Sequence, residues 1–202
     1  KLTVLQSAFV TSERGKVTGV VGRNGTGKSC LFKCIMGGIK PQNIFVRFND
    51  EQSTDYGHIG DRVKYLPQNL FMPPRMTLDE AFRLYDVEYD GLVSFDPKFH
   101  TFQKKQFREL SGGEARVAEM FIIIKSPSDF CILDEPFSNI APIHVEKMQS
   151  LIREEKANKG IIVSDHLYEA IIQVSDNLFL LRDGYTFLVR SREDLIRHGY
   201  IR

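Results

Sequence analysis

The fold is decided by one stretch of the sequence, Lys16-Val17-Thr18-Gly19-Val20-Val21-Gly22-Arg23-Asn24-Gly25-Thr26-Gly27-Lys28-Ser29. The part before Gly22 is apolar and rich in β-branched residues, which predicts a buried strand. The part from Gly22 onward matches the pattern G-x-x-x-x-G-K-[ST]. A helix is expected directly afterwards, because apolar residues recur at helical spacing up to Met36 and Gly37-Gly38 can end it. This order of strand, glycine-rich loop and helix indicates a site for phosphate groups.

Each residue type in the loop has a physical reason to be there. The glycines allow the loop to curl, so that its backbone N–H groups converge on phosphate oxygens beside the positive end of the helix. Lys28 can reach the β- and γ-phosphates of a nucleotide, and the Ser29 hydroxyl can ligate Mg²⁺. The residues expected to bind the nucleotide are therefore Gly22, Arg23, Asn24, Gly25, Thr26, Gly27, Lys28 and Ser29.

Composition excludes several other classes of protein. The 202 residues include 27 Lys and Arg against 26 Asp and Glu, a net charge of +1, which argues against nucleic acid as the main partner. The longest apolar run, Met120–Ile124, is far shorter than the roughly 20 residues of a membrane helix. We expect no leader segment at the start. The cysteines Cys30, Cys34 and Cys131 lack metal-binding spacing, so a reduced, cytoplasmic, soluble chain is expected.

Strands alternate with helices along most of the chain, which predicts an α/β fold with a mainly parallel sheet. Between about Pro73 and Lys125 there are helix signals only, including capping boxes at Thr77–Glu80 and Ser111–Glu114. We expect one domain over 1–202, with an α/β core in 1–72 and 127–202 and an inserted helical subdomain in 73–126. Further strands are expected at 44–48, 63–66, 130–133 and 161–164, helices at 143–159 and 167–174, a hairpin over 178–189 and a short last helix from 191.

Two acids follow the apolar strand Phe130–Leu133. The carboxyl end of a strand is where open α/β sheets bind ligands. Asp134 can hold Mg²⁺ through water, opposite Ser29. Glu135 points elsewhere and can polarise a water for attack on the γ-phosphorus. Two solvated acids at a strand end would be the alternative interpretation without the upstream loop.

A second candidate anion site is Leu110-Ser111-Gly112-Gly113-Glu114, which precedes an apolar helix. N–H groups, a hydroxyl and the helix dipole would come together there. A plain helix cap is the alternative. One small chain has no need of two γ-phosphate cradles, whereas two chains arranged head to tail do. We therefore expect each nucleotide to be closed in trans by the other chain's Ser111, Gly112, Gly113 and Glu114.

With this segment the sequence resembles the ATP-binding-cassette (ABC) ATPase family over nearly its whole length. The motifs stand in the family's order: Gly22–Ser29 (Walker A), Gln68 (Q-loop), Leu110–Glu114 (signature), Cys131–Pro136 (Walker B) and His166 (H-loop). Arg116 stands where the signature helix usually carries a basic residue. The resemblance implies a P-loop NTPase (RecA-like) core with an N-terminal antiparallel β portion. It also implies the cofactors ATP and Mg²⁺.

The resemblance also assigns roles. Lys28, Gln68, Glu135 and His166 would be catalytic, with Gln68 on the metal and the attacking water and His166 on the γ-phosphate. The metal ligands would be Ser29, Gln68 and Asp134. A neutral His166 could bridge a phosphate oxygen and Glu135.

The implied partners are a second nucleotide-binding subunit, in a homodimer or a heterodimer, and separate transmembrane subunits whose transport the ATPase powers from the cytoplasmic face of the cell membrane. The alternative function is a soluble ABC ATPase without transport, either mechanical or a regulatory scaffold.

Three positions depart from the family pattern. Cys30 replaces the usual Thr next to the α-phosphate, so a thiol is expected to make that nucleotide contact. Ala141 stands where the D-loop aspartate would fall. The aromatic residue that stacks on adenine is not evident, and Phe9, the nearest ring, is expected to pack in the core. The segment Phe95–Phe107 could either face a transmembrane subunit or belong to the core. Surface positions are expected for His58, His100, His144 and His198.

Overall fold

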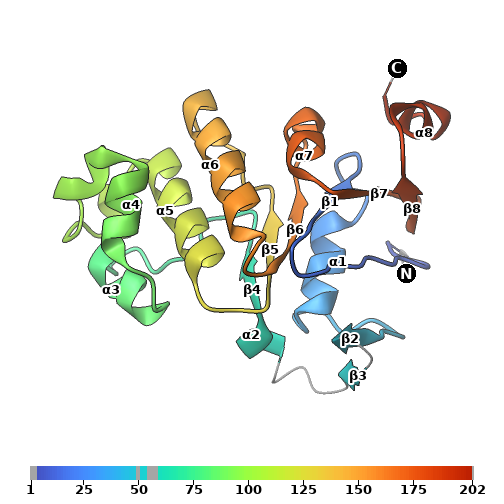
Figure 1. Ribbon diagram of the computed structural model, residues 1–202. Coiled ribbons are helices and arrows are strands. Elements are labelled where there is room, and N and C mark those ends of the chain that lie inside the picture. Colours follow the sequence, from blue (N-terminus) through green and yellow to red (C-terminus); the bar gives the residue numbers. More distant parts are fainter. Residues whose placement is uncertain (1–3, 49–50, 54–58, 202) are drawn as a thin grey trace.

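The computed structural model describes residues 4–48, 51–53 and 59–201 (Figure 1). Within them, a six-stranded sheet has the order β4-β5-β6-β1-β7-β8. Its neighbours are parallel except for the hairpin of β7 and β8. The mainly parallel α/β sheet is therefore confirmed. The strands are β1 Val17–Val21, β4 Val63–Leu66, β5 Phe130–Asp134, β6 Gly160–Ser164, β7 Asn177–Arg182 and β8 Tyr185–Val189.

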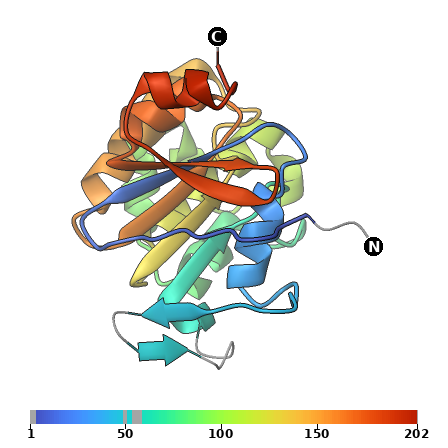
Figure 2. The same cartoon turned by 90° about the vertical axis from the view of Figure 1, so that its right-hand side faces the viewer.

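Helices cover both faces of this sheet, α1 on one and α5, α6 and α7 on the other (Figure 2). Successive side chains of a strand point to opposite faces. On β5, Ile132 therefore packs with Phe32 of α1, whereas Leu133 packs with the cluster that contains α5. Both faces of the strand are apolar because both are covered. The helices are α1 Lys28–Ile35, α2 Ile59–Arg62, α3 Leu78–Leu84, α4 Tyr89–Phe95, α5 Gly112–Lys125, α6 Pro142–Glu155, α7 Tyr168–Val174 and α8 Arg192–Arg197.

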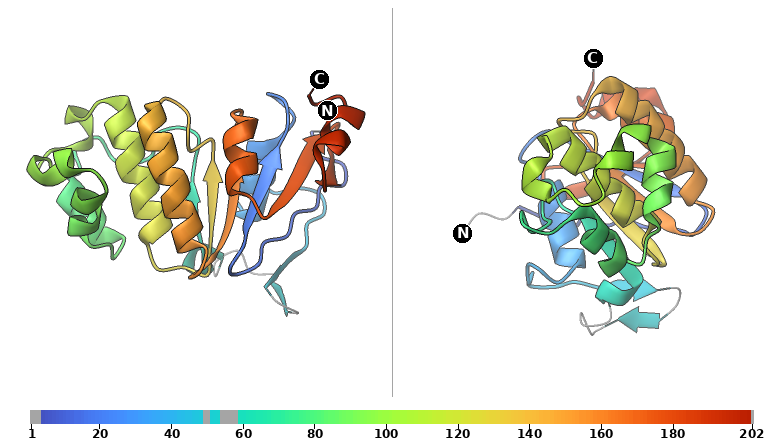
Figure 3. Two further views of the ribbon diagram at one scale, coloured as in Figure 1. Left: turned by 45° about the horizontal axis from the view of Figure 1, so that its top comes forward. Right: turned by 90° about the vertical axis from the view of Figure 1, so that its left-hand side faces the viewer.

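The segment between β4 and β5 is helical, as expected. It holds α3, α4, two short 3₁₀ helices (Pro97–Thr101 and Phe107–Glu109) and α5. Figure 3 shows α3 and α4 at one end of the molecule, outside the layer formed by α5 and α6. Helix α5 is buried from Ala115 to Ile124 and shares one apolar cluster with the strands. The division into an α/β core and an inserted subdomain stays a prediction.

An antiparallel β portion lies in the N-terminal part of the chain, as expected. Strands β2 (Val46–Phe48) and β3 (Glu51–Ser53) form a two-stranded sheet. The described residues before β1 form no strand. They are joined to the turn of the β7–β8 hairpin by the amides of Gln6 and Ser7, which donate to the carbonyl oxygen of Gly184 at 2.9 and 3.1 Å. Helix α2 is an element that no sequence pattern predicted.

Several side-chain expectations are settled by burial. Phe9 does not pack in the core: it is 64% exposed, and its ring meets Phe179 edge to face. Phe99 and Phe107 are buried, which favours the core interpretation of that aromatic segment.

The histidines behave differently from one another. His100 is exposed as expected. The prediction of a surface position is wrong for His144, because this residue is half-buried and its Nε2 lies 3.0 Å from an Asp96 carboxylate oxygen. His198 is half-buried against Phe187. His58 lies outside the described residues. In the part of the chain that the structure describes, no helix has both the length and the apolar character to cross a membrane.

Candidate active site

The glycine-rich loop connects β1 to α1 and requires glycine at two positions. Gly25 and Gly27 have φ angles of +80° and +104°, in the left-handed region that side chains disfavour. A Cβ atom on Gly27 would lie 2.7 Å from a methyl carbon of Val4. No side chain caps α1. The N-terminal N–H groups of this helix are therefore left to an outside acceptor, the role that phosphate oxygens take in such loops.

Lys28 is the first residue of α1 and its side chain is buried. Its ammonium group turns back into the loop and donates to the carbonyl oxygens of Gly22 at 2.8 Å and Arg23 at 3.4 Å. Burial lowers the pKa of Lys28, while the nearby Glu135, Asp134 and Asp165 carboxylates oppose that shift. The group is therefore a desolvated cation within the loop, where an incoming phosphate would replace weak neutral partners.

Asp134 ends β5 and is fully buried. One carboxylate oxygen accepts a hydrogen bond from the Ser164 hydroxyl and the other from the Tyr65 hydroxyl, each at 3.1 Å. Both donors come from strands that pair with β5. Burial, with the Asp134 charge second, raises the pKa of Tyr65 well above its usual value, so Tyr65 stays a donor. The carboxylate is thus held in one orientation and keeps lone pairs for a further ligand.

Glu135 follows Asp134 and has a φ angle of +50°, in the left-handed region that glycine usually occupies. Its amide donates to the carbonyl oxygen of Ser164 at 2.7 Å, and its carboxylate accepts from the Gln68 amide nitrogen at 2.8 Å. Such a backbone conformation is strained for a residue other than glycine. Gln68 is therefore in direct contact with the proposed base in the described state.

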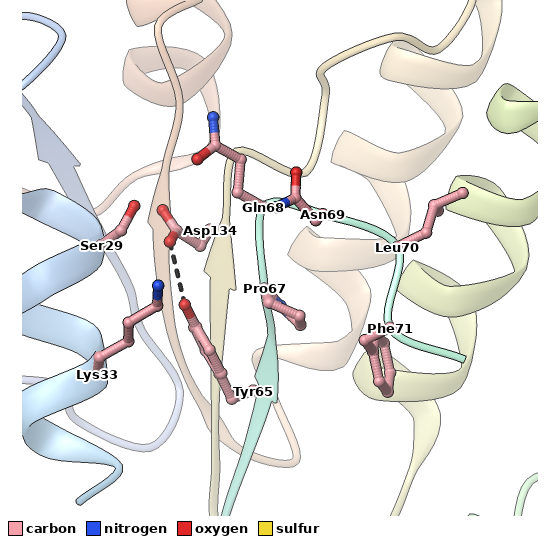
Figure 4. Close-up of a pocket in the computed structure, with 9 residues that line it drawn as sticks. All are labelled: Ser29, Lys33, Tyr65, Pro67, Gln68, Asn69, Leu70, Phe71 and Asp134. Atoms are coloured by element: carbon pink, nitrogen blue, oxygen red, sulfur yellow. Dashed lines mark hydrogen bonds between the residues drawn. The ribbon is translucent and has the colours of Figure 1, made fainter. Parts of the chain in front are cut away.

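A metal ion of the Mg²⁺ type fits the residues present. A cavity of about 160 Å³ is lined by Ser29, Gln68 and Asp134, and Figure 4 shows Ser29 and Asp134 facing each other across it from α1 and β5. A hydroxyl, an amide oxygen and a carboxylate are the hard oxygen donors that Mg²⁺ takes. Among the described residues there is no group of three or more His, Cys, Asp and Glu that could hold a metal. The remaining ligands would have to be phosphate oxygens and water.

Arg116, on α5, is buried behind this site. Its guanidinium donates to the carbonyl oxygens of Pro67 at 2.7 Å, Asp134 at 2.8 Å and Glu135 at 3.0 Å. Burial lowers the pKa of Arg116, but the guanidinium stays charged. The basic residue of the signature helix therefore joins the Gln68 segment to the backbone of both acids.

His166 follows β6, and its side chain is 48% exposed. Its Nδ1 lies 3.1 Å from a carboxylate oxygen of Asp165 and 3.5 Å from the Ser138 hydroxyl. Asp165 is fully buried and also accepts from the amides of Phe137 and Leu167. The acid next to the His166 ring is thus Asp165, and the described hydrogen bonds include none between His166 and Glu135.

The structure does not bring the signature residues to the loop of the same chain. Ser111 caps α5, accepting from the Glu114 amide at 3.3 Å while Glu114 accepts from the Ser111 amide at 2.8 Å. Ser111 and Gly112 are exposed. Figure 1 shows the start of α5 and the loop before α1 at the same edge of the sheet, with α6 and α7 between them in that view. The glycine-rich segment is thus both a helix cap and an open surface.

Sequence reasoning missed four residues of this region: Tyr65, Ser164, Asp165 and Glu119. Ser164 and Asp165 were recoverable in part, because they lie at the end of a strand expected to neighbour the Asp134 strand. Tyr65 donates to Asp134, and Glu119, on α5, accepts from the backbone amides of Phe71 and Met72; these bonds depend on how β4 and α5 pack, which no local pattern reports. Cys30 lies half-buried on α1 next to Ser29.

The fold and this set of groups define a nucleoside triphosphate-binding protein of the phosphate-loop class. Residues 5–138 match the family model described as ABC transporter. The chain therefore belongs to the ABC transporter family.

Individual proteins agree with this assignment. The chain is 27% identical to the lipopolysaccharide export system ATP-binding protein LptB of Acidithiobacillus ferridurans, over 98% of this chain and 88% of LptB. The structure of an ATP binding subunit of an ABC transporter has a TM-score of 0.81 at 21% identity, covering 98% of this chain and 88% of that one. The dimeric bacterial cassette MJ0796 has a TM-score of 0.75 at 16% identity, with coverage of 93% and 91%. At these identities the two structures show a common fold.

Proposed function

We propose that this chain hydrolyses ATP to ADP and phosphate in a head-to-tail pair of cassettes, and that the pair drives a separate membrane transporter. The observation that carries the proposal is that the start of α1, after β1, meets the end of β5: Ser29 and Asp134 line one cavity, and Lys28 lies close enough to Asp134 and Glu135 for their charges to act on it. Gln68, at the edge of the same cavity, contacts the proposed base.

ATP would be held first by the loop. The uncapped N–H groups at the start of α1 and the Lys28 ammonium bind the phosphates, and the Cys30 thiol faces the α-phosphate. Lys28 is already desolvated, so its interaction with phosphate is stronger than the same contact in water. Ser29, Asp134 and Gln68 would hold Mg²⁺, which neutralises charge that develops on the β- and γ-phosphate oxygens.

Glu135 would act as the base. Its carboxylate takes a proton from water as the water oxygen attacks the γ-phosphorus, and the bond from that phosphorus to the β,γ-bridging oxygen breaks. Gln68 must yield its hydrogen bond to Glu135 or share it with that water. His166 Nδ1 lies 3.1 Å from a carboxylate oxygen of Asp165, so Nε2 would be the ring nitrogen that contacts the γ-phosphate.

The second half of each site would come from another cassette. Ser111 and Gly112 are exposed, Gly113 and Glu114 are half-buried, and none of the four lines the cavity of its own chain. A two-fold arrangement places each such start against the other copy's nucleotide. The dimeric form of MJ0796, which is also known in a post-hydrolysis state bound to ADP and Pi, supports a pairwise arrangement.

The partners follow from the family. LptB is the ATP-binding protein of an export system, and by analogy this chain would serve transmembrane subunits from the cytoplasmic face of the membrane. The pair would be a homodimer or a heterodimer, with 73–126 as the helical subdomain that contacts the partners. The second candidate, a mechanical or scaffold ATPase without transport, is favoured by Ala141, which cannot supply a D-loop carboxylate.

The decisive experiment uses Glu135→Gln, which removes the base and keeps the size of the side chain. With Mg²⁺ and ATP this variant should run as a dimer in gel filtration, and without nucleotide as a monomer. The wild type should hydrolyse ATP and dimerise only transiently. A Glu135→Gln chain that stays monomeric at saturating ATP would rule out the paired mechanism. Co-purification of a transmembrane subunit with the tagged chain separates the transport function from the second candidate.

A further inference from the structure

The loop that carries Gln68 is fastened at both ends to one helix. Before Gln68, the carbonyl oxygen of Pro67 accepts from Arg116 at 2.7 Å. After it, one carboxylate oxygen of Glu119 accepts from the amides of Phe71 at 2.8 Å and Met72 at 2.9 Å. Arg116 and Glu119 are one turn apart on α5 and are 3% and 0% exposed. The residues between the fastened ends, 68–70, are exposed.

Glu119 is an unfavourable residue for stability alone. Its second carboxylate oxygen is buried with no hydrogen-bond partner among the described residues, and its nearest cation is Arg116 NH1 at 3.9 Å. Burial raises the pKa of Glu119, against the opposing effect of the two amides and Arg116. A buried, half-satisfied carboxylate usually costs stability compared with an apolar side chain of the same size. Its use must therefore lie in the two amides that it holds.

The amides of Phe71 and Met72 lie at the C-terminal end of the Gln68 loop, and the Gln68 side chain reaches the proposed base. Gln68 donates to Glu135 at 2.8 Å. The same helix, through Arg116, also holds the carbonyl oxygens of Asp134 and Glu135. The position of Gln68 relative to Glu135 is therefore set by bonds to the first turns of α5, the helix that Ser111 caps.

We propose that Glu119 is a positioning residue for ATP hydrolysis: it anchors the Gln68 loop to α5, so that the orientation of the signature helix decides whether Gln68 lies against Glu135. This inference rests on the function proposed above. The start of α5 would meet the nucleotide of the other copy. Through Glu119 and the Gln68 loop, the same helix is connected to Glu135, the base of its own site.

The test compares Glu119→Met, which keeps the length of the side chain and removes both acceptors, with Glu119→Gln, which keeps one acceptor oxygen for the amides. We expect Glu119→Met to lower kcat roughly 10-fold with KM for ATP changed less than about 2-fold. Glu119→Gln should lose at most about 3-fold in kcat. In a Gln68→Ala background, Glu119→Met should have no further effect, because the loop then carries nothing to position.

A matched control is Glu80→Met, since Glu80 also accepts from a backbone amide, that of Thr77, but away from the Gln68 loop. It should leave kcat unchanged. Hydrogen exchange of the wild type gives a readout that does not depend on a folded variant: the amides of Phe71 and Met72 should be strongly protected, and fast exchange at both would overturn the proposal. So would equal losses of kcat from Glu119→Met in the wild-type and Gln68→Ala backgrounds, or a Glu119→Gln variant as impaired as Glu119→Met.

A failure of the proposed ATPase function can be distinguished from a failure of the positioning role of Glu119. If ATP turnover does not depend on Lys28, the proposed function fails. If it depends on Lys28 but is indifferent to Glu119→Met, only the positioning role fails.

Discussion

Two glycine-rich helix starts lie at the same edge of this molecule and are built differently. Helix α1 has a left-handed Gly27 as its N-cap and no side-chain cap, and Lys28 is buried beside it. Helix α5 has Ser111 as its N-cap, with a complete capping box to Glu114. The first start leaves its N–H groups to a ligand, whereas the second already satisfies part of its own.

The difference indicates that the two helix starts have different roles in ATP binding and hydrolysis. The start of α1 has a dipole, free donors and a desolvated cation, and can bind phosphate without help. The start of α5 is a stable helix end that offers exposed glycine N–H groups only as a second contact. We therefore expect α1 to determine ATP affinity and, through it, turnover, and α5 to determine turnover in the pair without affecting affinity.

The largest effect is expected from Lys28→Ala. Loss of the buried ammonium should lower ATP turnover about 100-fold or more, because its interaction with the phosphates takes place in a desolvated site. Steady-state phosphate release measures this. The control is Lys40→Ala, at an exposed lysine beyond α1, which should be as active as the wild type. Turnover that survives Lys28→Ala would remove α1 from the mechanism.

The next largest effect is expected when a variant of the α5 start is mixed with a variant of the α1 start. Ser111→Arg places a bulky cation where the other copy's nucleotide would sit, so this variant should bind ATP normally and hydrolyse it poorly. Mixed with Lys28→Ala, it forms some pairs with one intact composite site. Roughly one quarter of the wild-type rate should return in the mixture, since half the pairs are mixed and each has one working site of two. A Ser111→Arg protein as active as the wild type would refute closure in trans.

A smaller effect concerns stability. Gly27→Ala forces a side chain into a left-handed backbone and toward Val4, and should lower the free energy of unfolding by about 2 kcal/mol. Gly112→Ala meets nothing within 4 Å and should change that free energy by less than about 1 kcal/mol. Urea denaturation compares the two variants. Equal losses would mean that the two starts do not differ as described.

The smallest effect is expected for the contact between Cys30, on α1, and the nucleotide. Cys30→Thr replaces a weak thiol donor by a hydroxyl, worth about 1 kcal/mol or roughly a 5-fold lower Kd for ATP. Equilibrium binding of ATP measures it. Cys34→Ala, a change at a buried cysteine on the same helix, should leave Kd unchanged. A Kd unaffected by Cys30→Thr would place Cys30 away from the nucleotide.

Much of the chemistry could be predicted because it is local. The loop, its lysine and its serine are consecutive, and their geometry follows from glycine conformations and a helix start within one stretch. Asp134 and Glu135 could be predicted because the end of a buried strand must fall at the ligand-binding edge of a parallel sheet. The burial of Phe99 and the exposure of Phe9 could not, since either ring could have met the core.

The sequence by itself determined the order of strands and helices, the phosphate loop, the two acids and the family resemblance, because each depends on neighbours in the chain. Only the tertiary structure decided what holds these groups in place. Tyr65 and Ser164 reach Asp134 because β4 and β6 flank β5, and Arg116 with Glu119 binds the Gln68 loop because α5 packs behind it. Such contacts join residues tens of positions apart, and they are fixed by the packing of the whole sheet rather than by any local pattern.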